Sequence, residues 1–183
     1  LRAGARQGLV AAKALLAGRY SSLRGVHKAL VHDGDDLNQL PGVGIEGPDG
    51  EGVYSNGAVA LHHKRLAVID PQGGAQPMVV DEVAVAFNGE IYNYVELRDE
   101  LIKLGHQFRT RSDTEVLLRA WLEWGEAAIA RFNGMFAFVL HDRRQRRVIA
   151  ARDHFGIKPL YWMRLGQSIW FGSEIKALLR PIV

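Results

Sequence analysis

Two segments with helical periodicity lie between two groups of short strand-like segments, and this order constrains the fold of the chain more than any other feature. The first helical segment, residues 94–104, places Leu97, Leu101 and Leu104 on one face. Gly105 follows directly, and glycine is the residue most typical of a helix C-terminus. We therefore predict a helix that buries this leucine face and ends at Gly105.

The second helical segment begins at Ser112 and closes at Gly125. Ser112 and Glu115 have the spacing of a capping box. In that motif the serine accepts from a backbone N–H, and the glutamate reaches back to the serine N–H. The apolar residues that we expect in the core are Leu117, Trp121 and Trp124.

Strand-like segments stand on both sides of the helices. They are found at residues 53–54, 58–61, 66–69, 83–87, 135–140, 148–151, 160–163 and 169–171. Several links between them are short, including Asn56-Gly57 and the basic run at residues 143–147, which we expect to be an exposed turn. Short links favour antiparallel pairing. Two antiparallel sheets with helices outside them would bury both apolar sets, which predicts an α+β layered sandwich.

Composition excludes several classes of function. The 183 residues contain no cysteine, so disulfides, thiolate catalysis and zinc–thiolate sites are not expected from them. No apolar run approaches the roughly 20 residues that span a bilayer, and Lys13 interrupts the mildly apolar residues 10–17, so we expect a cytoplasmic protein that binds no membrane. The net charge of +3 falls on scattered residues without a base-stacking aromatic motif, so nucleic acid is not an expected partner.

Asn88 and Gly89 directly follow the apolar run at residues 83–87. At the end of a strand, such a pair presents a backbone N–H beside a side-chain amide, and these two donors together can stabilise an oxyanion. A plain Asn-Gly turn is the alternative interpretation, because this dipeptide is common in tight turns.

Two charged residues also allow a functional interpretation. Arg65 precedes an apolar run, where its guanidinium could bind a carboxylate or form a surface ion pair. Asp113 lies in the first turn of the second helix, where it could receive an ammonium group or only complement the helix dipole. His62 and His63 are adjacent and face opposite ways in a strand, so no metal site is expected there.

Arg65, Asn88, Gly89 and Asp113 all belong to a series of longer sequence motifs. From residue 47 the chain contains GPDGEG at 47–52, HKRLAVID at 63–70, GAQPM at 74–78, FNGEIYNYVELRDEL at 87–101, SDTEVLL at 112–118, GMFAFVLHD at 134–142, ARDHFGIKPLYW at 151–162 and FGSEIKALL at 171–179. In these motifs, which cover about 130 residues, the chain resembles the glutaminase domain of asparagine synthetases, which are class II glutamine amidotransferases. The resemblance implies a four-layer αββα sandwich of two antiparallel sheets, the fold of N-terminal-nucleophile hydrolases.

The same resemblance implies roles for individual residues. Asn88 and Gly89 correspond to the oxyanion pair of the family. Arg65 corresponds to the residue that binds the glutamine α-carboxylate, and Asp113, with help from Glu90, to the acceptor of the α-ammonium. The backbone that lines the pocket corresponds to Leu66, Ala67, Val68 and Ile69.

The chain departs from the family pattern at its beginning. The family uses an N-terminal cysteine as nucleophile, whereas this chain begins with Leu1 and contains no cysteine. Residues 1–40 are rich in Ala, Gly and Arg and do not resemble the first family strand, so we expect them to be atypical and poorly ordered, with the glutaminase domain in residues 41–183. We expect the chain to be a fragment without the synthetase domain.

The resemblance also implies partners. Glutamine is the expected substrate, and the parent protein would use its nitrogen for ATP-dependent synthesis of asparagine from aspartate. No cofactor is expected in this domain, since ATP and Mg²⁺ would bind the synthetase domain, and the parent protein could be a homodimer. The alternatives are a catalytically inactive glutamine-binding or regulatory module, and a glutaminase-like domain of another class II amidotransferase.

Overall fold

The structure, a computed structural model, describes residues 50–56, 59–65, 70, 73–166 and 168–179. A four-stranded antiparallel sheet in the order β3-β4-β5-β6 forms its centre. Its strands are β3 (Met78–Val80), β4 (Val83–Ile91), β5 (Gly134–Asp142) and β6 (Arg147–Arg152). Two antiparallel ribbons accompany it, β1 (Gly50–Asn56) with β2 (Val59–Arg65), and β7 (Tyr161–Leu165) with β8 (Ser168–Gly172). The helices are α1 (Tyr94–Lys103), α2 (Asp113–Trp124), the 3₁₀ helix η3 (Gly125–Arg131) and α3 (Ile175–Leu179).

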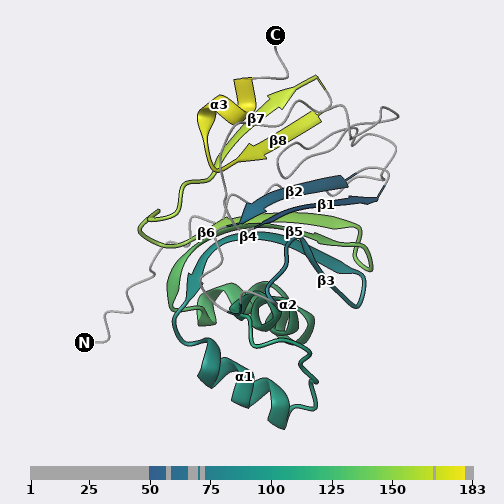
Figure 1. Ribbon diagram of the computed structural model, residues 1–183, viewed down its shortest axis with the longest axis vertical. Coiled ribbons are helices and arrows are strands. Elements are labelled where there is room, and N and C mark those ends of the chain that lie inside the picture. The colour runs from purple at the N-terminus through teal and green to yellow at the C-terminus, as the bar shows by residue number, and fades with distance from the viewer. Residues whose placement is uncertain (1–49, 57–58, 66–69, 71–72, 167, 180–183) are drawn as a thin grey trace, which may run out of the picture.

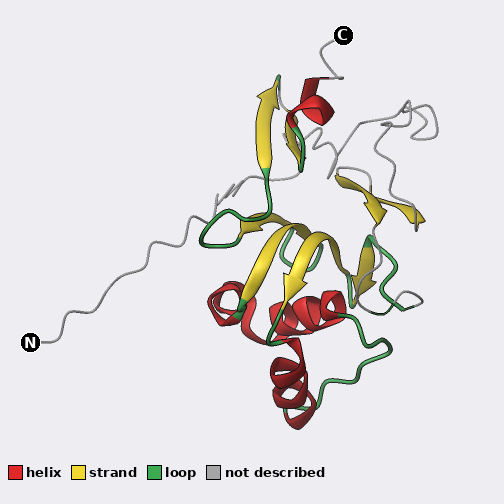
Figure 2. Ribbon diagram, turned by 60° about the vertical axis from the view of Figure 1, so that its left-hand side comes forward, coloured by secondary structure: helices red, strands yellow, loops and turns green. Residues whose placement is uncertain are grey.

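These elements form four layers, which confirms the predicted αββα sandwich (Figures 1 and 2). Helices α1 and α2 cover one face of the central sheet, and the two ribbons lie on the other face, with α3 outside the β7–β8 ribbon. The expected strand at residues 66–69, and the atypical segment at residues 1–40, lie outside the described residues. The proposed division of the chain at residues 40 and 41 therefore stays a prediction.

Alternation along the central strands supplies the apolar side chains for two separate cores. Phe136, Phe138 and Leu140 of β5 pack on the helical side, in the core that contains Leu117 and Trp121 of α2. The intervening Val139 belongs to the core on the opposite side, where apolar residues of β2, β4, β6 and β8 meet. A third, smaller core between the ribbons and α3 contains Ala60, Trp170 and Leu178. The central sheet is thus buried on both faces, as a sandwich requires.

The helix ends confirm most of the expected signals and correct one. Helix α1 ends just before Gly105, which has a φ of +98°. Ser112 caps α2 by accepting from the backbone N–H of Thr114 at 3.1 Å. The capping-box prediction for Glu115 is wrong, because its carboxylate accepts instead from the backbone N–H groups of Arg109 and Thr110 and from the Thr110 hydroxyl. Glu115 is 1% exposed, so a buried carboxylate fixes the segment that enters α2 by these hydrogen bonds.

His141 of β5 is buried between the central sheet and the β1–β2 ribbon. Its Nδ1 lies 3.2 Å from the hydroxyl of Tyr54, and the residue is 1% exposed. Burial, reinforced by the nearby charge of Arg143 and opposed by that of Asp142, lowers the pKa of His141 from 6.5 to about 4. The folded chain therefore holds this imidazole neutral at mildly acidic pH.

We expect this histidine to weaken the fold in acid. Between pH 6.5 and about 4 the unfolded chain binds a proton at His141 that the folded chain does not, so the free energy of unfolding falls as pH falls through this window. The total effect is up to about 3 kcal/mol. Urea unfolding from pH 7 to pH 4.5 should show a shallower decline for His141→Gln than for the wild type. The exposed His154→Gln is the matched control, and equal slopes in all three proteins would contradict the assignment.

Candidate functional site

The outer edge of β4 is only partly covered by its neighbouring strand. On one side β4 pairs with β5 along its whole length, from Val83 to Ile91. On the other side, the three-residue strand β3 ends its pairing at Val85. Backbone donors and acceptors of β4 beyond Val85 therefore need partners other than a strand. This uncovered edge is where the predicted Asn88-Gly89 pair lies.

Side chains occupy two of the backbone N–H groups along this edge. The N–H of Phe87 donates to Oε1 of Gln76 at 2.7 Å, and the N–H of Ile91 donates to Oδ2 of Asp113 at 3.1 Å. Backbone groups of a strand point to opposite edges in alternation, so the N–H of Gly89 points to the same edge, between these two. Within the described part of the chain, no protein group accepts from the Gly89 N–H.

The strand opposite Gly89 confirms this direction. Phe136 is the register partner of Gly89, and both of its backbone groups face away from β4. Its N–H donates to Oδ2 of Asp153 at 3.2 Å, and its carbonyl accepts from the N–H of Asp153 at 2.7 Å. Gly89 and Phe136 are thus a pair without mutual backbone hydrogen bonds, and the Gly89 N–H is directed outward.

The geometry at Gly89 requires a glycine. Its φ is +148°, a conformation that residues with a side chain rarely adopt. A Cβ at this position would lie 2.1 Å from the carbonyl oxygen of Met135 and 2.7 Å from Cα of Phe136. Close approach to β5 and the unusual backbone together exclude a side chain at this position.

Asp113 places a buried carboxylate at the same edge. It is the first residue of α2 and is 4% exposed. Burial raises the pKa of its carboxyl, the backbone N–H groups of Ile91 and Thr114 oppose this, and the nearby carboxylate of Glu90 raises it further. A positively charged ligand group between Asp113 and Glu90 would stabilise the ionised carboxylates, and it would thereby offset both the cost of burying Asp113 and the repulsion from Glu90.

The predicted site residues are only in part described. The structure brings Asn88, Gly89 and Glu90 of β4 together with Asp113 of α2. Arg65 is the last residue of β2, and its side chain, like the whole of residues 66–69, lies outside the described residues. The described residues contain no group of His, Asp or Glu side chains that could hold a metal ion.

Sequence reasoning missed two residues at this edge. Gln76 binds the N–H of Phe87, and Nε2 of His63 lies 3.0 Å from the Phe87 carbonyl oxygen. Because a carbonyl only accepts, His63 carries its proton on Nε2. Pro77 is the one sequence signal that points to Gln76. A proline has no N–H to donate to a neighbouring strand, so Pro77 indicates that the ladder stops here and that another group must bind β4.

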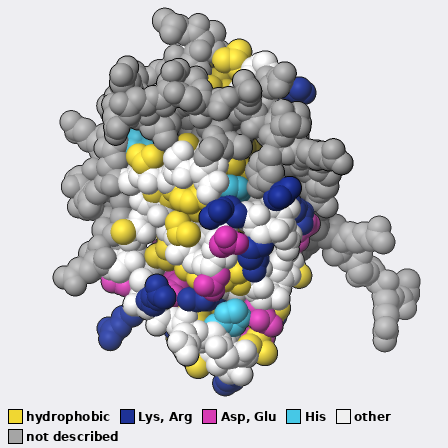
Figure 3. Space-filling view, turned by 90° about the vertical axis from the view of Figure 1, so that its right-hand side faces the viewer, with side chains coloured by type: hydrophobic (Ala, Val, Ile, Leu, Met, Phe, Trp, Pro, Cys, Tyr) yellow, Lys and Arg dark blue, Asp and Glu magenta, His cyan; other side chains and the backbone are white. Residues whose placement is uncertain are grey.

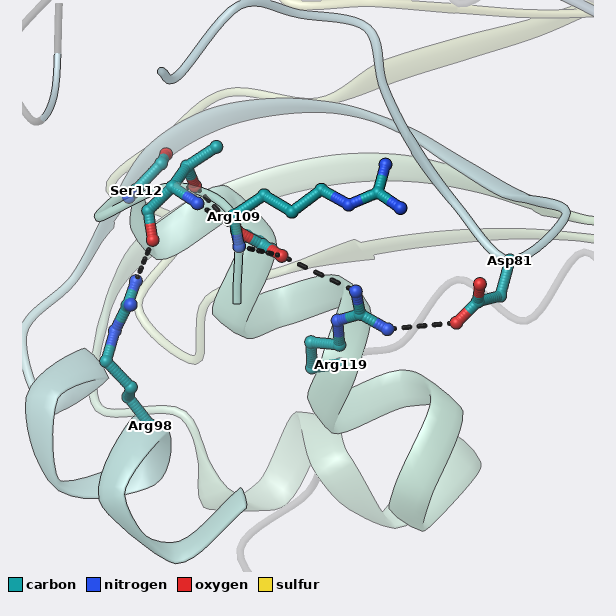
Figure 4. A network of polar contacts seen from close by, with 7 residues as sticks. Asp81, Arg98, Arg109, Ser112 and Arg119 are labelled. Carbon is teal, nitrogen blue, oxygen red and sulfur yellow. Dashed lines mark hydrogen bonds and ion pairs between the residues drawn. The ribbon is translucent and has the colours of Figure 1, made fainter. Parts of the chain in front are cut away.

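A cleft of about 290 Å³ lies elsewhere, between β3 and the side of α2. Glu115 and Arg119 line it, and Arg119 donates to Asp81 at 2.9 Å and lies 3.6 Å from Glu115 (Figure 4). On the molecular face in Figure 3, basic and acidic side chains are likewise interleaved over an apolar background. None of the predicted site residues lines this cleft, so it is separate from the edge of β4.

Comparison of the sequence with known proteins places the chain in one family. The glutamine amidotransferase domain family matches residues 23–182. Asparagine synthetase [glutamine-hydrolyzing] 3 of Bacillus subtilis is 43% identical over 157 residues, which are 83% of this chain and 26% of that protein. Asparagine synthetase [glutamine-hydrolyzing] 2 of Arabidopsis thaliana is 51% identical over 136 residues, 72% of this chain and 23% of that protein. The chain thus spans about a quarter of the length of these relatives.

A solved structure shares the fold. The glutamine phosphoribosylpyrophosphate (PRPP) amidotransferase of B. subtilis, complexed with ADP and GMP, superposes with a TM-score of 0.56 and 27% identity. The match covers 67% of this chain and 29% of that one. No helix in the described residues is both long and apolar enough to cross a membrane.

Proposed function

The chain belongs to the glutamine amidotransferase domain family, and we propose that it is the glutamine-binding domain of an asparagine synthetase-type amidotransferase. The observation that carries this proposal is the edge of β4. There the outward N–H of Gly89 stands between two N–H groups that side chains already occupy, and the carboxylate of Asp113 lies beside it. A donor for an amide oxygen and an acceptor for an ammonium group are therefore adjacent, as glutamine requires.

Each predicted residue takes one part of the ligand in this proposal. The side-chain amide oxygen of glutamine accepts from the Gly89 N–H and from Asn88, which would stabilise negative charge on that oxygen during attack at the amide carbon. The α-ammonium lies between Asp113 and Glu90. Arg65 binds the α-carboxylate as a fork, and the backbone of residues 66–69 lines the pocket.

The absence of cysteine limits what these 183 residues do by themselves. In the parent protein, glutamine hydrolysis would supply ammonia for ATP-dependent synthesis of asparagine from aspartate, with ATP and Mg²⁺ in a separate synthetase domain and no cofactor in this one. A cytoplasmic location and a homodimeric parent are part of the same proposal. A non-catalytic glutamine-binding module is the second candidate, and the lack of a thiol in the sequence favours it. Mass spectrometry of the native N-terminus separates the two, because an upstream cysteine would restore the enzyme.

Glutamine binding tests the proposal directly. Calorimetry with L-glutamine should show saturable binding that Arg65→Ala and Asp113→Asn each remove. Truncating one partner of a desolvated charge pair weakens binding by about 2–5 kcal/mol, which is enough to abolish a measurable signal. Asp99→Asn, an exposed carboxylate of α1, is the matched control for Asp113→Asn and should bind as the wild type does. Equal affinity in the wild type, Arg65→Ala and Asp113→Asn would refute the assignment.

A further inference from the structure

Gln76 lies where the β3–β4 ladder would continue if β3 were longer. The register of β3 on β4 pairs Met78 with Val85. Two residues upstream, the same register would place Gln76 opposite Phe87. The Phe87 N–H, however, donates to the side chain of Gln76 and not to its backbone carbonyl, and the distance to Oε1 is 2.7 Å. Since an N–H only donates, this contact also fixes which end of the Gln76 amide is oxygen.

The backbone of Gln76 is turned toward the other sheet. A Cβ on Gly52 of β1 would lie 2.1 Å from the Gln76 carbonyl oxygen, so these two backbones approach closely. Pro77, the next residue, has no N–H to donate to β4. Close packing against β1 therefore holds the Gln76 main chain in place, and only its side chain reaches the edge of β4.

The other end of the Gln76 amide faces the helix that carries Asp113. Nε2 of Gln76 donates to the hydroxyl oxygen of Thr114, the residue after Asp113, at 3.4 Å. Asp113 itself accepts from the Ile91 N–H. The N–H groups of Phe87 and Ile91, on either side of Gly89, thus donate to the side chains of Gln76 and Asp113. Gln76 also contacts Thr114, the residue that follows Asp113 in α2.

We propose that Gln76 is a positioning residue that sets the direction of the Gly89 N–H and its place relative to Asp113. It acts through Phe87, two residues before Gly89 on the same edge, while His63 holds the Phe87 carbonyl from β2. This inference rests on the proposed function, because it assigns Gln76 to the alignment of the two groups that receive glutamine.

The test compares Gln76→Met with Gln76→Glu in the whole chain. Methionine has the same length, but its thioether sulfur is only a weak acceptor and its terminal methyl group would stand in place of Oε1, whereas glutamate keeps an oxygen acceptor at the same place. In amide NMR spectra, Gln76→Met should speed hydrogen exchange at Phe87 and shift the peaks of Asn88 and Gly89. Glutamine affinity, measured well below the melting temperature, should fall by about tenfold, because the Gly89 N–H is no longer aligned with the amide oxygen of the ligand. Gln76→Glu should restore both properties.

Gln107→Met is the matched control, since Gln107 is exposed and forms no hydrogen bond with β4 in the described part of the chain. It should leave the Asn88 and Gly89 peaks and the affinity unchanged. A merely structural role would lower the melting temperature of Gln76→Met without moving the Gly89 peak or the affinity, and that result would overturn the inference. If the wild type bound no glutamine, the proposed function would fail, and the Asn88 and Gly89 peaks alone would still decide the role of Gln76.

Discussion

A polypeptide of these 183 residues is expected to release no ammonia from glutamine. The route that the family resemblance implies needs a thiolate to attack the amide carbon, and the sequence contains no cysteine. Loss of a catalytic nucleophile lowers turnover on the order of 10⁶-fold in enzymes where it has been removed. An oxyanion donor at Gly89 stabilises charge only after attack has begun, so it does not replace the nucleophile.

Coupled detection of ammonia and of glutamate, with purified chain at high concentration, checks this expectation. Any signal must be compared with Asn88→Ala, which removes one of the two proposed oxyanion donors. Turnover that Asn88→Ala abolishes would show that a different residue of the chain acts as nucleophile. Turnover that Asn88→Ala leaves unchanged would indicate a contaminating glutaminase.

Gly89→Ala is expected to produce the largest loss of stability among single substitutions at the site. The added Cβ would meet the Met135 carbonyl oxygen at 2.1 Å, and φ at this position is +148°. Backbone strain and overpacking each cost about 1–3 kcal/mol. The sum, about 4 kcal/mol, is a large part of a typical domain stability of about 5–15 kcal/mol. Urea unfolding at neutral pH measures it.

Gly105→Ala is the control that separates the two causes. Gly105 has a φ of +98°, but a Cβ there would meet nothing within 4 Å. Its alanine variant should therefore lose only about 1–2 kcal/mol. The change in the unfolded chain is the same in both variants, so it cancels in the comparison. Equal losses for Gly89→Ala and Gly105→Ala would mean that the contact with β5 plays no part.

The layers of this fold could be predicted from the sequence because the spacing of apolar residues shows which face of a helix or strand is buried. The helix with Leu97 and Leu101 on its buried face is confirmed, whereas Leu104 lies beyond the end of the helix and is 52% exposed. The strand at residues 83–87 is also confirmed, and it continues to Ile91. Both elements are long enough, and bury enough of one face, for the apolar pattern to be unambiguous. The exposed basic turn after β5 is also confirmed.

The details that sequence could not predict concern polar groups whose partners are distant in the chain. Glu115 has the spacing of a capping-box residue, but the segment at residues 109–110 folds back and takes its carboxylate instead. Gln76 and His63 meet Phe87 only because β3 stops early and β2 lies across β4. Local spacing contains no information about such contacts. Motif resemblance, by contrast, pointed to Asn88, Gly89 and Asp113, which lie along β4 and at the start of α2, and their roles stay predictions.

The short strand β3 also sets a length scale for the ligand. Because it leaves the edge of β4 open from Phe87 onward, the Gly89 N–H and the N–H of Ile91, which Asp113 occupies, are successive outward groups of one strand. Outward groups repeat every two residues, or about 6.8 Å. In the proposed binding mode, the N–H of Gly89 receives the side-chain amide, and the Asp113 carboxylate that receives the α-ammonium is held one such repeat further along the strand, at the N–H of Ile91. Asparagine, shorter by one methylene, could satisfy one of them only by leaving the other, so the pleat of the strand itself would discriminate between the two amides.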